Sequence, residues 1–199
     1  MKPEEEIKIL RRVLVIILFG LIIYFFLDTI PNSSEELYKT ILKADADLLE
    51  ISVDSQMAES YYAEAGYAYE DKDYNTVESN CRLAREYYFE ESQGYKKVKA
   101  ELKDKEIDDK LIVLYIENLE LLSEISNNMF EACEHFEVAA RYYDTYFNYN
   151  VPYDDTSYDM ADKEINMMNE KISAHDNAVE KYNNKLSEFR FELEKRLED

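Results

Sequence analysis

Two histidines decide whether the chain could hold a carboxylate-bridged metal pair of the kind that helical proteins often bind. Such sites use Glu-x-x-His motifs on two helices. The residues three positions before His135 and His175 are Ala132 and Ile172, so the motif is absent. His135 projects away from the apolar stripe of its segment, and His175 lies on its own stripe, where we expect a core histidine. The sequence therefore predicts no metal centre.

Carboxylates at Asp71, Asp73 and the nearby Asn75 match the opening of a calcium-binding loop. An EF-hand loop also needs glycine at its sixth position and glutamate at its twelfth, and this segment has neither. A loose calcium site that adds Asp154 and Asp155 stays open. There is no glycine-rich phosphate loop, nucleophile elbow or catalytic triad pattern. We therefore expect a protein that is not an enzyme and has no cofactor.

The two cysteines, Cys81 and Cys133, lie at nearly the same level if their segments pair as antiparallel helices that turn near residue 105. A disulfide between them is sterically plausible, and an extracytoplasmic setting would permit it. The alternative is a pair of buried free thiols. The sequence leaves both readings open, and no C-x-x-C motif indicates redox catalysis.

Tyrosines gather around two of the expected turns between helices. Eleven of the eighteen tyrosines lie within residues 61–74 and 142–158, and the helix order places both turns at the same end of the protein. Tyrosine offers a large contact area at low entropic cost and is common in binding hot spots. The alternative is that these rings fill a wide end of the core with their hydroxyls outward. The candidate residues of a partner-binding tip are Tyr67, Tyr69, Asp71, Asp73, Tyr74, Tyr146, Tyr149, Tyr153, Asp154 and Asp155.

Apolar side chains recur at alternating intervals of three and four through most of the chain, which predicts an all-α fold with one buried face per helix. We expect helices at about 34–70, 74–103, 107–147 and 156–198, with Asp73 as the N-cap of the second. The run LIVLYI at 111–116 would suit a strand by itself, but it continues a helical stripe and is expected to be a helix buried on a wide face. Short connections favour an elongated, antiparallel up-and-down four-helix bundle. A single tetratricopeptide-like spacing near residues 61–84 has no second copy at a period of about 34 residues, which disfavours a solenoid.

An uncharged run at 13–27 (VLVIILFGLIIYFFL) predicts a transmembrane anchor helix. Counted as 9–30, this helix would span about 33 Å, enough to cross a hydrocarbon core of about 30 Å. Four basic residues precede the run and only two follow it within a comparable distance, so we expect residues 1–8 in the cytoplasm. After a linker at 31–35, the bundle at 36–199 would then lie outside the cell membrane. A cleaved signal peptide is the alternative, although no small-residue cleavage point follows the run.

Charge narrows the classes of partner. The chain has a net charge of −21, and residues 1–31 contain equal numbers of basic and acidic residues, so the body holds the whole excess. A body of this charge is repelled by nucleic acid and by anionic lipid headgroups. Binding of a basic protein, binding of cations and simple solubility are the readings that remain.

These observations lead to two hypotheses about function. The first is a single-pass, non-enzymatic scaffold or accessory subunit that presents a tyrosine-rich, acidic tip to another protein. The second is an extracytoplasmic ligand-binding or sensor module. Four-helix bundles outside the membrane resemble the input domains of chemoreceptors, a likeness of architecture only. That likeness implies signalling through a partner protein, because only about eight residues precede the anchor. The identity of a small-molecule ligand is unknown.

Overall fold

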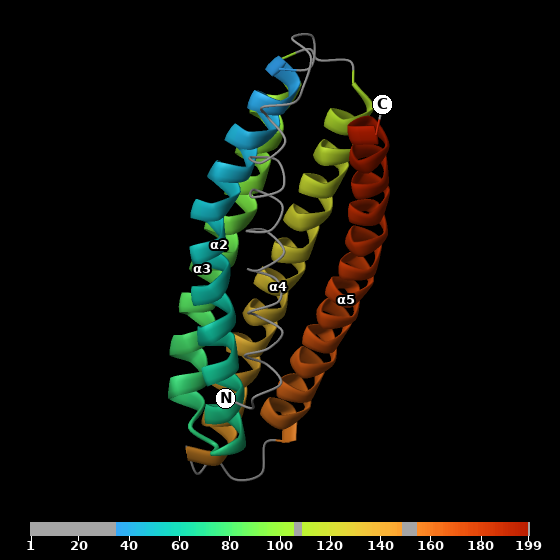
Figure 1. Cartoon of the computed structure of the whole chain (residues 1–199). Coiled ribbons are helices and arrows are strands. Elements are labelled where there is room, and N and C mark those ends of the chain that lie inside the picture. Colours follow the sequence, from blue (N-terminus) through green and yellow to red (C-terminus); the bar gives the residue numbers. More distant parts are fainter. Residues whose placement is uncertain (1–34, 106–108, 149–154, 199) are drawn as a thin grey trace.

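The computed structural model describes residues 35–105, 109–148 and 155–198, and its regular structure is helical throughout. The helices are α2 (Glu35–Glu70), α3 (Tyr74–Lys103), α4 (Lys110–Asn148) and α5 (Asp155–Glu198) (Figure 1). The described residues form no β-strand, which confirms the predicted all-α class. The segment 111–116 lies in α4, and four of its six side chains are buried, as expected of a helix with a wide buried face.

Consecutive helices run antiparallel and pack side by side (Figure 1). With 30 to 44 residues each, they form rods of about 45 to 66 Å at 1.5 Å per residue. In the described part of the chain, the extensive helix contacts are those of α2 with α3, α3 with α4 and α4 with α5. Helices α2 and α5 are therefore the two edges of the array, which is more open than a square bundle in which the first and last helices also pack together.

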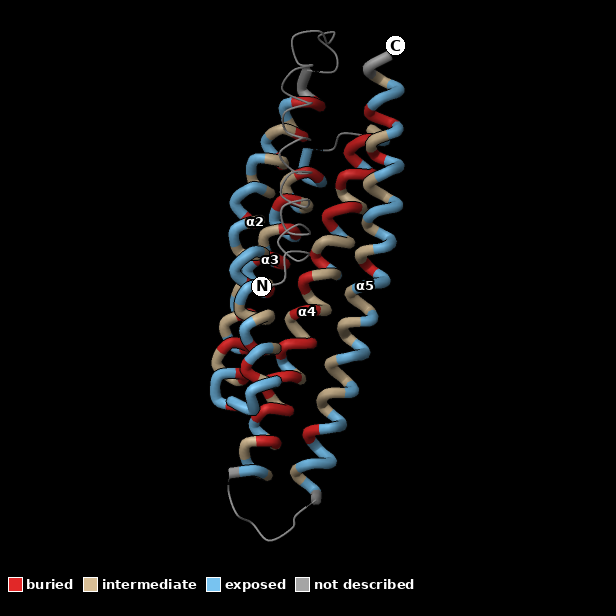
Figure 2. Tube along the Cα trace, turned by 60° about the horizontal axis from the view of Figure 1, so that its bottom comes forward, coloured by how far each residue is buried: buried red, intermediate tan, exposed pale blue. Residues whose placement is uncertain are grey.

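Buried residues lie on the inward-facing sides of the helices (Figure 2). They form two clusters, one toward each end of the rod. The first cluster holds large residues of all four helices, among them Ile41, Leu111 and Phe189. The second is built from small and aromatic residues, among them Ala84, Ala139 and Tyr143. Burial of these stripes, more than helix propensity, stabilises helices of this length.

A buried polar layer separates the two clusters near the middle of the rod. The Ser92 hydroxyl lies 3.0 Å from the Ser123 hydroxyl and donates to the Asn127 side-chain oxygen at 2.9 Å. Beside them, Glu91 is only 6% exposed and accepts a hydrogen bond of 2.9 Å from the Tyr95 hydroxyl. Burial raises the pKa of Glu91 to about 7, although hydrogen bonds from neighbouring hydroxyls oppose the rise. The single charge on the α3 stripe is thus held in a polar belt inside an otherwise apolar core.

The two helical glycines of α2 and α3 differ in their surroundings. A Cβ atom at Gly94 would lie 2.6 Å from Cγ1 of Ile51, so the missing side chain allows α2 to approach α3 closely. A Cβ atom at Gly66 would have no heavy atom within 4 Å. Gly94 is therefore a packing residue at the α2–α3 contact.

The predicted anchor at 9–30 lies outside the described residues. Among the helices that the structure describes, none is long and apolar enough to cross a membrane.

The described helices begin close to the predicted positions. They begin at residues 35, 74, 110 and 155, and the apolar spacing predicted that they would begin at about 34, 74, 107 and 156.

Candidate functional site: the aromatic tip

The turn between α2 and α3 sets the positions of the tyrosines at this end of the rod. Asp73 caps α3, since its side chain accepts hydrogen bonds from the Thr76 backbone nitrogen at 3.2 Å and from the Thr76 hydroxyl at 2.6 Å. This confirms the predicted N-cap. Lys72 has a φ of 61°, in the left-handed region, and the Asp73 nitrogen donates to the Ala68 carbonyl at 2.9 Å. These contacts reverse the chain within three residues, so the last rings of α2 lie beside the first ring of α3.

Aromatic rings from all four helices meet here in one connected group, which we call the aromatic tip. Its members are Tyr62, Tyr69, Tyr74, Phe136, Tyr143, Tyr146, Phe147 and Tyr158. The Tyr74 ring stacks on Phe147 with centroids 5.9 Å apart and planes 10° apart. Tyr143 stacks on the same Tyr74 ring at 5.5 Å. Offset stacked and edge-to-face rings add to the stabilisation from burial.

The aromatic tip has an inner and an outer part. Tyr74 and Tyr143 are only 7% and 5% exposed, so they belong to the core. Phe147 is 50% exposed and Tyr158 is 39% exposed, although both rings rest on the buried ones. The inner rings therefore fill the core, as one of the two interpretations expected, and the outer rings are exposed to solvent.

Charges surround the rings without entering the stack. The Tyr143 hydroxyl donates to Asp162 on α5 at 2.5 Å, and burial together with this acidic acceptor holds the pKa of Tyr143 well above its usual value. Burial likewise raises the pKa of Tyr74. The ammonium of Lys72 lies 5.9 Å from the centre of the Phe147 ring, in the range of a cation–π contact. Tyr74 and Tyr143 therefore keep their hydroxyl protons at neutral pH.

The structure brings some of the predicted tip residues together and separates others. Tyr69, Tyr74 and Tyr146 belong to the aromatic tip. Tyr67 is 47% exposed on α2, and both Asp71 and Asp73 are exposed in or beside the turn. The remaining candidates, Tyr149, Tyr153, Asp154 and the side chain of Asp155, lie outside the described residues.

Phe147, the most exposed ring of the aromatic tip, was not among the predicted tip residues, which included no phenylalanine. Its spacing could have revealed it, because Phe147 lies four residues after Tyr143 on the same helix and so covers the same face. Lys72, whose backbone conformation and ring contact both belong to the turn, was not predicted either.

Among the described residues, neither histidine belongs to a group of three or more His, Cys, Asp or Glu side chains that could hold a metal ion. His135 Nδ1 lies 2.7 Å from Glu164 Oε2 on α5, and His175 Nδ1 lies 3.0 Å from Asp176 Oδ1. The His135 contact joins α4 to α5.

Both cysteines are free thiols in the structure, with no bridge between them. Cys81 and Cys133 are fully buried in the cluster below the aromatic tip. Burial raises the pKa of both thiols well above its usual value. A buried thiol that stays protonated is a poor nucleophile, so these residues act as small core side chains.

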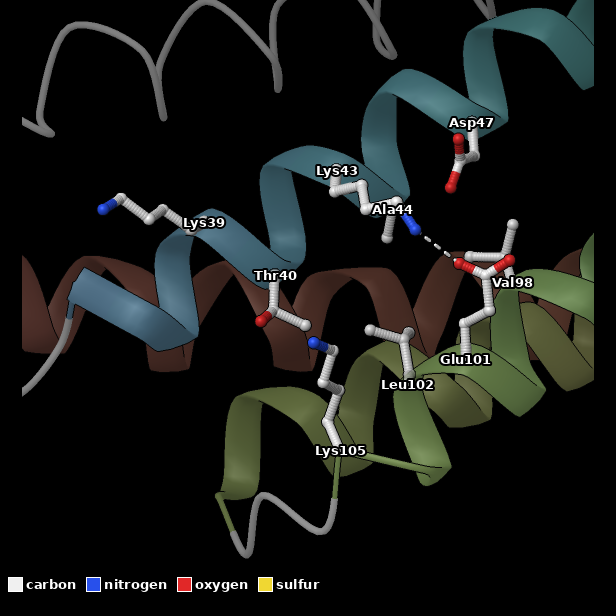
Figure 3. Close-up of a pocket in the computed structure, with 9 residues that line it drawn as sticks. All are labelled: Lys39, Thr40, Lys43, Ala44, Asp47, Val98, Glu101, Leu102 and Lys105. Atoms are coloured by element: carbon white, nitrogen blue, oxygen red, sulfur yellow. Dashed lines mark hydrogen bonds and ion pairs between the residues drawn. The ribbon is translucent and has the colours of Figure 1, made fainter.

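A cavity of about 260 Å³ lies at the other end of the rod, between α2 and the end of α3 (Figure 3). Its walls include both signs of charge: Lys43 and Glu101 form an ion pair of 2.6 Å across it, and Lys105 lies at its rim. None of the residues predicted for the partner-binding tip lines this cavity.

Comparison of the chain with protein-family models, with curated proteins and with solved structures gave no match. The assignment of function therefore rests on the residues and their arrangement.

Proposed function

We propose that this protein is a non-enzymatic scaffold or accessory subunit whose aromatic tip binds another protein. The observation that supports this most is the pair of exposed rings, Phe147 and Tyr158, resting on buried Tyr74 and Tyr143. Binding hot spots combine a large aromatic contact area with little loss of side-chain entropy, and a supported ring meets both conditions before the partner arrives. Tyr67 is a further exposed ring, on α2 close to the α2–α3 turn.

In this proposal, residues 9–30 hold the protein in the cell membrane by a single pass, with residues 1–8 in the cytoplasm. The chain then leaves the membrane into α2, so the α2–α3 turn and the aromatic tip point away from the bilayer. The strongly acidic body favours this arrangement because anionic headgroups repel it. The anchor fixes one end and the distal tip contacts the partner.

The experiment that tests partner binding uses full-length protein purified from its native membranes in mild detergent. We expect Phe147→Ala and Tyr67→Ala to reduce recovery of the co-purifying protein at least tenfold, since both remove exposed contact area. The melting temperature should change by no more than about 2 °C, because neither ring lies in the core. Phe191→Ala is the matched control, since Phe191 is 69% exposed on α5 and lies far from the tip. Equal recovery from all three variants would refute the proposed docking role.

The proposed anchor needs a separate test. Membranes are washed at alkaline pH, and the full-length chain is compared with a chain that lacks residues 9–30. We expect the full-length chain to remain in the membrane pellet and the shortened chain to enter the supernatant. Release of the full-length chain by the wash would refute the proposed anchor. It would not affect the proposed role of the aromatic tip.

A further inference from the structure

The solvent face of α2 has a second, uncharged seam that no helix of the described array covers. In addition to the inward stripe through Ile51, uncharged side chains recur at alternating intervals of four and three along the opposite side of the helix. The members of this outer seam are Ala46, Leu49, Val53, Gln56, Ser60, Ala63 and Tyr67. The spacing is that of the a and d positions of a coiled coil.

The outer seam is open to solvent. Leu49 is 47% exposed and Val53 is 60% exposed, and Met57 beside them is 36% exposed. Helix α2 is an edge of the array and packs extensively on α3 alone, through the inward stripe. Around the two large residues, the seam is lined by small side chains such as Ala46 and Ser60, which allow a second helix to approach closely.

The charge around the outer seam determines what kind of helix could cover it. From Ala44 to Asp71, the chain contains eight acidic residues and no lysine, arginine or histidine. Burial raises the pKa of Asp54, and the charges of Glu90 on α3 and of Glu50, which is exposed beside the seam, add to the rise. Between residues 44 and 71, α2 itself therefore contributes only negative charge along this face.

A second copy of the same chain fits this face poorly. In either a parallel or an antiparallel pairing of two α2 helices over residues 44–71, every charged group that flanks the seam faces another acidic or uncharged group. Like charges across a helix pair are destabilising and select against that pairing. The complementary occupant is a helix that has an apolar seam of its own and lysine or arginine at the flanking positions.

We propose that the outer seam of α2 is a docking surface for a basic amphipathic helix of a different protein, packed along residues 46–67 as a two-helix coiled coil. At 1.5 Å per residue the contact would extend for about 32 Å, or three heptads. This surface contains no member of the aromatic tip, and it ends at Tyr67 on α2. The proposal does not depend on what the tip binds.

The test uses full-length protein in mild detergent and a fluorescein-labelled, three-heptad helical peptide with leucine and isoleucine at a and d and lysine at e and g. A control peptide keeps the same seam and has glutamate at e and g. We expect the lysine peptide to bind with a salt-dependent affinity and the glutamate peptide to bind at least tenfold more weakly, as measured by fluorescence anisotropy. Equal binding of both peptides would overturn the proposed charge preference.

The double variant Leu49→Gln, Val53→Gln separates the seam from simple attraction to an acidic surface, because it leaves every charge in place. We expect it to weaken the lysine peptide at least tenfold, whereas Phe191→Gln and Phe147→Ala leave the affinity unchanged. Unchanged binding to the double variant would overturn the proposal. If that variant lost helix content by circular dichroism, Ser60→Lys, which places a cation within the seam, is expected to weaken the lysine peptide in its place, and unchanged affinity would again overturn it. A protein dimer in light scattering that the seam variants abolish would assign the face to a second copy and reject the proposed basic partner.

Discussion

Replacement of Glu91 by glutamine is expected to change the pH dependence of stability in a defined direction. Glu91 is nearly fully buried, and burial raises its pKa from 4.5 to about 7, with the charge of Glu59 on α2 adding to the rise. The folded protein therefore holds this proton more tightly than the unfolded chain does. The stabilisation is complete below the unfolded pKa of 4.5 and is lost as the pH rises through about 7. A difference of this size corresponds to about 3 kcal/mol in the free energy of unfolding.

Glutamine keeps an oxygen that can accept the hydrogen bond from the Tyr95 hydroxyl, and it has no proton to lose. We expect the free energies of unfolding of wild type and Glu91→Gln to be similar near pH 5. By pH 8 the variant should be more stable by up to about 3 kcal/mol. Buried Asp45, whose pKa is raised to about 6, gives both proteins the same additional slope, so its contribution cancels in the difference.

The assay is denaturant unfolding of the full-length protein in mild detergent, followed by circular dichroism at several pH values between 5 and 8. Glu90→Gln is the matched control, because it makes the same substitution at the preceding residue, whose side chain is exposed. The control should differ from wild type by no more than about 0.5 kcal/mol at any of these pH values. A difference between Glu91→Gln and wild type that does not grow with pH, or a variant that is less stable at pH 8, would refute the reasoning.

Three further predictions concern packing, buried charge and the thiols. Gly94→Ala should destabilise the protein by about 1 to 2 kcal/mol because its Cβ would overlap Ile51. Gly66→Ala, with open space around the new Cβ, should instead stabilise α2 by about 0.5 to 1 kcal/mol. Thermal unfolding of both variants checks these values, and a stabilised Gly94→Ala would contradict the packing role. Glu137→Ala should lower the free energy of unfolding by about 2 to 3 kcal/mol, since the buried Glu137 carboxylate pairs with two arginines, one at 2.7 Å. Glu134→Ala, which removes a more exposed carboxylate, should lower it by less than about 0.5 kcal/mol. Equal losses in denaturant unfolding would argue against the buried pair. The two buried cysteines should resist alkylation by iodoacetamide in the native protein and react fully after unfolding. An intact protein mass about 2 Da below that of the reduced protein would instead reveal a disulfide.

The helices could be predicted because apolar side chains at helical spacing must be buried together, and this requirement does not depend on knowledge of the partner helix. The first and last residues of each helix were harder to predict. α4 begins at Lys110 because Asp109 caps it, with its side chain accepting a hydrogen bond of 2.8 Å from the Leu111 nitrogen. This cap was not predicted. Asp109 also pairs with Arg196 at 2.7 Å, which joins the start of α4 to the end of α5.

Arrangement in space could not be predicted to the same degree. The stripe spacing is the same whether α2 and α5 close a square or form two open edges, so it does not select between these arrangements. The close approach at Gly94 depends on which residue of α2 lies opposite, and that register is set by tertiary packing.

The candidate site, too, could be predicted only in part. The convergence of the tyrosines followed from helix order, and the structure has a tyrosine-rich aromatic cluster at that end. Which rings are buried and which are exposed depends on the angles between helices, so the sequence could not separate Tyr143 from Phe147.

The central claim is that the aromatic tip contacts a protein partner, and site-specific photocrosslinking in living cells tests it most directly. The photoreactive amino acid p-benzoylphenylalanine replaces Phe147 at the tip in one full-length chain and Phe191 at the far end of α5 in another. We expect irradiation to join a second protein to the chain labelled at position 147 and to give no such product at position 191. The same crosslinked product at both positions, or none at position 147, would contradict the account.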